Sequence, residues 1–272
     1  MGHSPNIPLL NYSCHSSEFR EGESFTFFHS IGIVLSGAME LNNGQKKKIF
    51  RKGELFSSGK NHLLKFIKLP AEDGEFKSLS LSFDEQVLRD FSHEYGYTSE
   101  RKQHSEAFTS FPKNEELIVF IQSLLGYEKL LNNNEKTALL RIKQKEALTL
   151  LLEYDNSLKN TLFDFSEPHK VDLEAFMNKN FRFNVHLDKF AYLTGRSLAT
   201  FKRDFQKIFG ISPRQWLQQK RLEEANYLIT QKGKSVSEIY LDLGFENLSH
   251  FSFAFKRQFG FAPTTRQSKK IF

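Results

Sequence analysis

Hydrophobic and polar residues alternate along much of the first third of the chain. Leu79, Leu81 and Phe83 occupy every second position, and the same spacing recurs from Ile31 to Leu35. A period of two is typical of a strand that buries one face. Short turn sequences interrupt the pattern at Ser36-Gly37, Asn42-Asn43-Gly44, Lys52-Gly53 and Ser58-Gly59. The segment from about Ser24 to Phe83 is therefore predicted to form an antiparallel meander or a small β-barrel.

The spacing changes to that of amphipathic helices after Asp84, a predicted N-cap, and Gly96 is placed to end the first helix. The segment from Leu139 to Leu152 has a wide apolar face, whose central stripe is Leu140, Ala147, Leu148 and Leu151. A face this wide has room for two partners. We predict that it packs on the β domain and dimerises with a second copy of the chain. Complete burial within one chain is the open alternative.

A more polar stretch from Asn156 to Pro168 breaks the helical pattern and is predicted to separate two domains. We expect an N-terminal domain over residues 1–160 and a C-terminal domain over residues 169–272. The segment from His169 to Phe272 has 18 Lys and Arg against 9 Asp and Glu, or +9, and the rest of the chain has 20 against 23, or −3. The positive charge is therefore concentrated in the C-terminal third, which is typical of proteins that bind nucleic acid.

The C-terminal domain contains a repeat with a spacing of 50 residues. Phe201, Phe205, Phe209, Gly210 and Pro213 recur as Phe251, Phe255, Phe259, Gly260 and Pro263. The pattern of each copy predicts a helix, a turn and a second helix, with Gly195 and Gly244 in the turns. Ser197 is the predicted cap of the second helix in the first copy. Ser235 and Glu238 have the spacing of a capping box in the second copy.

The outward faces of the two second helices are candidates for insertion into the DNA major groove. The helical period turns Ile208 and Leu248 towards the core and leaves Ala199, Lys202, Arg203, Gln206, Ser249, Ser252, Phe253 and Lys256 outside. Arg, Lys, Gln and Ser can bond to base edges in the groove, and an apolar group can touch a thymine methyl. Pro213 suits the first turn of a joining helix of about 17 residues, roughly 25 Å long. Such a helix can hold the two hairpins near one DNA turn apart, about 34 Å.

Four short stretches stand out between about Val171 and Gln267. They are Gly210-Ile211-Ser212-Pro213, Arg221-Leu222-Glu223-Glu224-Ala225, Gly244-Phe245-Glu246-Asn247, and Phe251-Ser252 through Phe255-Lys256. In these stretches the segment resembles the C-terminal DNA-binding region of the AraC/XylS transcription regulators. The resemblance implies that the second helix of each hairpin reads bases. The residues expected at the DNA are Ser197, Ala199, Thr200, Lys202, Arg203, Gln206, Asn247, Leu248, Ser249, Ser252, Phe253 and Lys256.

Two positions depart from the family's pattern, because Phe253 stands where an arginine is frequent and Ala199 is short. Direct bonding to bases is therefore expected to rest mainly on Lys202 and Arg203. The resemblance also implies a cupin-like effector or dimerisation domain before the DNA-binding region, a homodimer, activation of transcription, and RNA polymerase as a partner. The predicted fold class is α+β: a cupin-like β-barrel with a helical dimerisation segment, then an all-α domain of two helix-turn-helix units joined by a long helix.

The sequence gives less support to a disulfide, a membrane span or a metal site. The single cysteine, Cys14, excludes an internal disulfide and favours a reducing compartment. No stretch approaches the roughly 20 apolar residues of a membrane span, so we expect a cytoplasmic protein that has no membrane partner. The expected partner is double-stranded DNA. His29 and His62 do not form a His-X-His pair, so we expect them to be surface residues or satisfied polar groups. We therefore predict no metal or other cofactor and no enzymatic activity.

One other function stays open at this point, a cupin-type ligand-binding or metal-dependent enzymatic barrel whose helical tail mediates association. The effector of a regulator is also open. The barrel interior can hold a small molecule, bind a partner protein, or be packed solid with phenylalanine.

Overall fold

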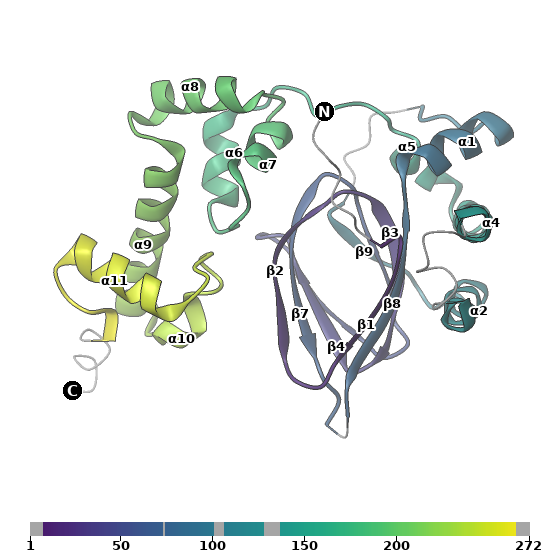
Figure 1. Ribbon diagram of the computed structural model, residues 1–272, viewed down its shortest axis with the longest axis horizontal. Helices are drawn as coiled ribbons and strands as arrows, with labels where there is room; N and C mark the ends of the chain where they lie inside the picture. Colours follow the sequence, from purple (N-terminus) through teal and green to yellow (C-terminus); the bar gives the residue numbers. More distant parts are fainter. Residues whose placement is uncertain (1–7, 73, 101–105, 128–136, 265–272) are drawn as a thin grey trace. The chain divides into compact units, whose positions relative to one another are not determined.

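The structure, a computed structural model, describes residues 8–72, 74–100, 106–127 and 137–264 (Figure 1). The chain divides into two compact units, Met1–Ser166 and Glu167–Phe272. Gln267, at the end of the segment that resembles the DNA-binding region, lies outside the described residues. Among the helices that are described, none is long and apolar enough to cross a membrane.

The first unit is built on two antiparallel sheets. The five-stranded sheet has the order β1 (Leu10–His15), β8 (Phe76–Phe83), β3 (His29–Ser36), β6 (Leu55–Ser58) and β9 (Phe108–Ser110). The four-stranded sheet has the order β2 (Phe19–Thr26), β7 (His62–Leu69), β4 (Ala38–Asn42) and β5 (Lys47–Arg51). The two sheets form an open arrangement that is compatible with the predicted cupin-like barrel. Antiparallel sheets followed by a helical unit confirm the predicted fold class.

Apolar side chains fill the space between the two sheets. The five-stranded sheet contributes Val34, Phe56, Phe76 and Phe108, and the four-stranded sheet contributes Met39, Leu41, Phe50 and Leu64. Phe50 meets Phe108 edge to face, with ring centroids 6.3 Å apart. Of the three contents that the sequence leaves open for this interior, the described residues therefore show a packed core rich in phenylalanine.

Helices cover the other face of the five-stranded sheet. They are α1 (Glu85–Tyr95), α2 (Glu115–Ser123), the 3₁₀ turn η1 (Leu124–Tyr127), α4 (Thr137–Tyr154), η2 (Asn156–Leu158) and α5 (Lys159–Leu162). The predicted boundaries of α1 are confirmed: the Asp84 side chain accepts from the backbone N of Val87, and Gly96 ends the helix with a φ of 72°. The alternating residues Ile31, Leu79 and Leu81 point into the core under these helices.

The apolar stripe of α4 that is predicted for dimerisation lies in the core of the first unit. Ala147, Leu148 and Leu151 are buried in the core beneath the helices, and Leu140 packs against that core. The wide apolar face of α4 is covered by the sheet and by the neighbouring helices of the same unit. The alternative of burial within one chain agrees with the packing of these four residues, and dimerisation stays a prediction.

His29 also differs from the sequence prediction, because it is buried with one ring nitrogen unsatisfied. Its Nδ1 accepts from the backbone N of Lys60 at 3.3 Å, and its Nε2 has no hydrogen-bond partner among the described residues. Burial lowers the pKa of His29 to about 3, and the nearby Lys60 contributes in the same direction. The folded chain therefore holds this imidazole neutral.

The second unit is helical and contains both copies of the repeat. Its elements are α6 (Leu173–Asn180), α7 (Leu187–Leu193), α8 (Leu198–Phe209), α9 (Pro213–Lys232), α10 (Val236–Ile239) and α11 (Leu248–Phe259). The predicted caps are confirmed, since Ser197 accepts from the backbone N of Thr200 and Ser235 forms a capping box with Glu238. Gly195 has a φ of 64° in the first turn, where an added Cβ would lie 2.4 Å from the backbone of His169.

Three details of the second unit differ from the prediction. α9 has 20 residues, three more than predicted, which makes it about 30 Å long. α10 has only four residues and is continued by turns. Ile208 and Leu248 are 46% and 43% exposed instead of facing the core.

Arg221 joins the two halves of the second unit. It lies near the middle of α9 and is buried. Its guanidinium donates to the carbonyl oxygens of Phe181 at 2.7 Å and Phe183 at 2.8 Å, in the loop before α7, and to that of Gly244 at 3.1 Å, in the turn of the second copy. Gly244 has a φ of 80°, and a Cβ there would lie 3.0 Å from the Arg221 side chain. The turn can approach the guanidinium this closely because it carries a glycine.

The burial of His29 predicts a loss of stability in mild acid. Above about pH 6.5 this histidine is neutral in both the folded and the unfolded chain. As the pH falls from 6.5 towards 3, the unfolded chain takes up a proton that the folded chain does not, so the free energy of unfolding decreases. Between pH 7.5 and pH 5.0 we expect the loss from this residue to be about 2 kcal/mol.

Urea unfolding followed by circular dichroism measures this loss. His29→Leu should lack the 2 kcal/mol component, to about the accuracy of the method, and His93→Leu, at an exposed histidine of α1, should retain it. An equal pH dependence in all three proteins would show that His29 takes up its proton in the folded chain.

Removal of the Arg221 guanidinium should destabilise the second unit. Arg221→Met leaves three buried carbonyl oxygens without this donor, and we expect the free energy of unfolding to fall by about 3 kcal/mol or more. The single tryptophan, Trp216, packs against Phe205 and Phe209 in this unit, so its fluorescence reports the unfolding. Arg214→Met, at an exposed position of the same helix, is the matched control and should change stability by about 0.5 kcal/mol or less. Similar midpoints for the two variants would contradict the role of Arg221.

Candidate nucleic-acid interface

The two predicted recognition helices are equivalent in length and register. α8 and α11 each have 12 residues, and their fourth and eighth residues, Phe201 and Phe205 or Phe251 and Phe255, are buried. The sixth residue is Arg203 in α8 and Phe253 in α11. At 100° per residue the sixth position lies on the side opposite the fourth and the eighth. Both helices therefore present an outward face centred on their sixth residue.

α9 sets the separation of these faces. The two recognition helices lie at opposite ends of α9 (Figure 1). With 20 residues, α9 is about 30 Å long, close to the roughly 34 Å between successive major grooves on one side of B-DNA. The length of α9 is thus comparable with the spacing of two adjacent grooves.

The cationic side chains predicted on α8 are exposed. Lys202 and Arg203 both lie at the surface, and 66% of the Arg203 side chain is accessible. Ala199 is exposed one turn before Arg203, and Lys207 is exposed one turn after it. The outward face of α8 therefore has a small residue, an arginine and a lysine in succession.

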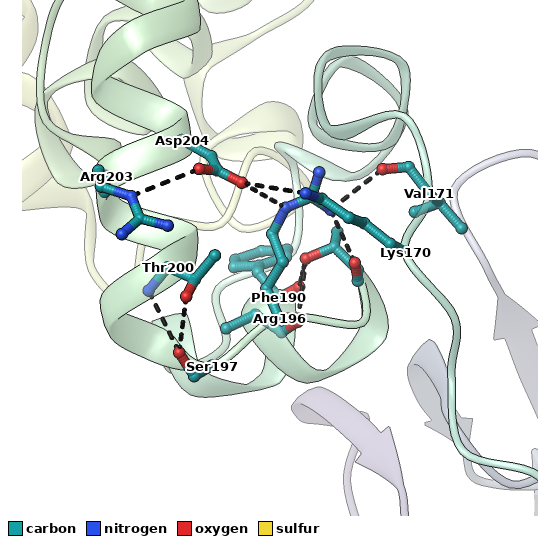
Figure 2. Close-up of polar contacts among 10 residues, drawn as sticks. Lys170, Val171, Phe190, Arg196, Ser197, Thr200, Arg203 and Asp204 are labelled. Atoms are coloured by element: carbon teal, nitrogen blue, oxygen red, sulfur yellow. Dashed lines mark hydrogen bonds and ion pairs between the residues drawn. The ribbon is translucent and has the colours of Figure 1, made fainter.

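A polar network fixes α8 to the preceding helix and turn (Figure 2). The Arg196 side chain, of which only 7% is exposed, donates to the carbonyl oxygens of Val171 at 3.0 Å and Thr194 at 2.7 Å and to the Asp204 carboxylate at 3.2 Å. This hydrogen bond from Arg196, assisted by the charges of Lys170 and Arg203, holds the pKa of Asp204 below its usual value. The one carboxylate of α8 is thus ionised and pairs with Arg196, and it also lies 3.8 Å from Nε of Arg203, whose side chain stays 66% exposed (Figure 2).

The outward face of α11 has a different chemistry. Ser249 is exposed one turn before Phe253, and Arg257 is exposed one turn after it. Phe253 itself is 68% exposed, more than any other large hydrophobic residue that the structure describes. Ser252 is half-buried beside it, and Lys256 is exposed. An aromatic ring thus occupies the centre of a polar and cationic surface.

Four residues predicted at the DNA have side chains that are engaged within the protein. Ser197 caps α8 and also donates to the Thr200 hydroxyl at 3.0 Å. Asn247 caps α11, where its side-chain oxygen accepts from the backbone N of His250 at 2.7 Å. Gln206 donates to the carbonyl oxygen of Gly210 at 2.7 Å. In this structure these contacts hold the ends of the recognition helices.

The sequence prediction omitted two exposed cations, Lys207 and Arg257. They occupy the tenth position of α8 and of α11, one turn beyond the centre of each outward face. Lys207 and Arg257 are equivalent positions of the 50-residue repeat and are both basic. The repeat itself was therefore the signal that could have identified them. The network of Arg196 and Asp204 was omitted as well, because neither residue belongs to the repeated pattern.

The part of the chain that the structure describes contains no group of three or more His, Cys, Asp or Glu side chains placed to hold a metal ion.

Family models match both units. The model of a helix-turn-helix domain matches residues 190–268. The model of the ExsA N-terminal regulatory domain matches residues 29–164, which is half of the 272 residues.

Individual proteins extend the match. The HTH-type transcriptional regulator ExsA of Pseudomonas aeruginosa is 25% identical over 272 residues, covering 97% of this chain and 91% of its own. The virulence regulon transcriptional activator VirF of Yersinia enterocolitica is 31% identical over 158 residues, and the aligned part covers 56% of this chain and 58% of VirF. The solved structure of a single-residue variant of apo ToxT from Vibrio cholerae aligns over 97% of this chain and 98% of the ToxT chain, with a TM-score of 0.45 and 13% sequence identity. The matches to both family models, one of which spans half of the sequence, show that the chain belongs to the AraC/XylS family of transcription regulators.

Proposed function

We propose that the chain activates transcription by inserting α8 and α11 into adjacent major grooves of a promoter. The observation that carries this proposal is the duplicated helix face: two helices in the same register, at opposite ends of a helix about 30 Å long, each with exposed polar and cationic residues. A solvated helix face needs neither the duplication nor this spacing.

Electrostatics support DNA as the partner. The segment from His169 onwards has a net charge of +9. Lys207 and Arg257 are exposed beyond the centres of the two faces and are suited to phosphate contacts along the groove walls. Contacts of this kind release counterions, so affinity for DNA falls steeply as salt rises.

Base reading in the first groove is assigned to α8. Arg203 is exposed at the centre of the face and can donate two parallel hydrogen bonds to O6 and N7 of guanine. Ala199 leaves space on the N-terminal side of Arg203, and Lys202 lies beside it. The ion pair of Arg196 and Asp204 orients the helix so that these side chains face outwards.

The alternative of a ligand-binding or enzymatic barrel is not favoured by any observation in the first unit, since the space between the sheets is filled with apolar side chains. A cavity of about 200 Å³ lies instead on the outer side of the five-stranded sheet, lined by His29, Ser57 and Leu151 among others. A small-molecule effector would therefore bind there rather than between the sheets. A homodimer formed through α4 would have to use residues outside the buried stripe, such as the exposed Ile142.

DNA binding is tested with duplexes selected from a random library by the purified full chain. Arg203→Ala should weaken binding to the selected duplex by about 1–3 kcal/mol and should reduce the preference over a scrambled duplex. Lys207→Ala should weaken binding to both duplexes equally and should lower the slope of log affinity against log salt by about one. Binding by the unchanged chain that ignores both sequence and salt would refute the proposed function.

Activation is tested by transcription in vitro from a promoter that contains the selected sequence. The chain should raise the yield of transcript by RNA polymerase, and Arg203→Ala should lose this effect at the same concentration, because it no longer occupies the site. A decrease in transcript on addition of the unchanged chain would identify a repressor.

A further inference from the structure

The two recognition helices have similar residues one turn before and one turn after the centre of the outward face, but they differ in the central residue. Each outward face begins with a small residue, Ala199 or Ser249, and ends with a cation, Lys207 or Arg257. Between them stands Arg203 in α8 and Phe253 in α11, both at the sixth position of the helix. Both copies thus have a small residue and a cation on either side of the centre, whereas the central side chain is charged in one copy and apolar in the other.

Phe253 is free to project from the surface of the unit. It is 68% exposed, and the residues one turn away on its N-terminal side and directly before it are serines, Ser249 and Ser252, whose side chains are too short to cover a phenyl ring. A single exposed phenylalanine is common on protein surfaces and by itself indicates no function. Here, however, it stands at the position where the other copy presents its base-reading arginine.

The groups that the major groove offers determine what Phe253 can recognise. Guanine O6 and N7, adenine N6 and N7, and the cytosine amino group all require a hydrogen-bonding partner, which a phenyl ring does not supply. The apolar group on a base edge in this groove is the C5 methyl of thymine. Contact between this methyl and the ring removes apolar surface of both from water.

We infer that the two half-sites are read by different chemistry: α8 reads guanine through Arg203, whereas α11 reads thymine methyl groups through Phe253. This inference rests on the proposed function, because it requires α11 to enter a major groove. It has a further consequence. Half-sites with different chemistry are not interchangeable, so each chain binds its operator in one orientation only.

The test replaces single thymidines of the selected duplex by deoxyuridine, which removes the methyl group and leaves every hydrogen-bonding group of the base in place. Binding of the full chain is measured for each substituted duplex. In the half-site that faces α11 we expect affinity to fall about fourfold for each methyl group that Phe253 contacts. In the half-site of α8, substitutions of thymidine should have no effect of this size.

Variants connect the effect to Phe253. Phe253→Ala should bind the thymidine and the deoxyuridine duplex with equal affinity, while Tyr227→Ala, at an exposed aromatic residue of α9, should discriminate between them as the unchanged chain does. Phe253→Arg should change the base selected at that position from thymine towards guanine. Because Phe253 is exposed, these variants should fold, and Trp216 fluorescence during unfolding verifies this.

The outcomes separate the inference from the function on which it rests. Sequence-specific binding that is insensitive to every deoxyuridine substitution would overturn the inference and leave the proposed function standing. Discrimination that persists in Phe253→Ala would assign the methyl contact to another residue and would also overturn it. If Phe253→Ala binds DNA like the unchanged chain but fails to activate transcription, the ring contacts a protein partner instead. Absence of specific binding by the unchanged chain would be a failure of the proposed function itself.

Discussion

The geometry of the second unit depends on one buried cation. A guanidinium group loses its hydration when it is buried, and this loss is tolerated only where hydrogen bonds replace the water. Arg221 meets that requirement with carbonyl oxygens from the loop before α7 and from the turn before α11. The side chain that avoids an unsatisfied charge therefore also connects the two helix-turn-helix units to the middle of α9. A lysine has a single nitrogen and could not reach carbonyl groups that approach from different directions.

Caps and turns are the part of the fold that the sequence predicts best, because the interactions involved are local. Ser197 and Ser235 each accept a hydrogen bond from a backbone N–H three residues later, and Gly96 and Gly195 adopt positive φ angles. These contacts need no knowledge of the remaining fold. The alternation that predicted strands is equally local, and so the antiparallel sheets and the two helical hairpins followed from pattern alone.

Long-range contacts were not predictable in the same way. Arg221 bonds to Phe181, 40 residues away, and no spacing in the sequence marks that pair. His29 was expected at the surface or satisfied, yet β3 buries it beside a cavity that Leu151 of α4 also lines, and its Nε2 has no described partner. The apolar face of α4 shows the same limit: periodicity reveals how wide such a face is, but only the fold reveals whether a sheet or a second chain covers it.

Comparison of the two copies shows which features the helix-turn-helix unit requires. In the first copy Arg196, directly after the turn glycine, pairs with Asp204 of the recognition helix. In the second copy the residue after the turn glycine is Phe245, and the residue 50 positions after Asp204 is Ala254; both are buried in one apolar core. A buried ion pair and an apolar contact can substitute for each other in holding two elements together, provided that each is complete. The capping residues, the turn glycine and the paired phenylalanines, in contrast, occur in both copies, because they determine the path of the backbone. The contacts behind the helix and the residue at the centre of its outward face therefore both differ between the copies: α8 has an ion pair and Arg203, whereas α11 has an apolar core and Phe253.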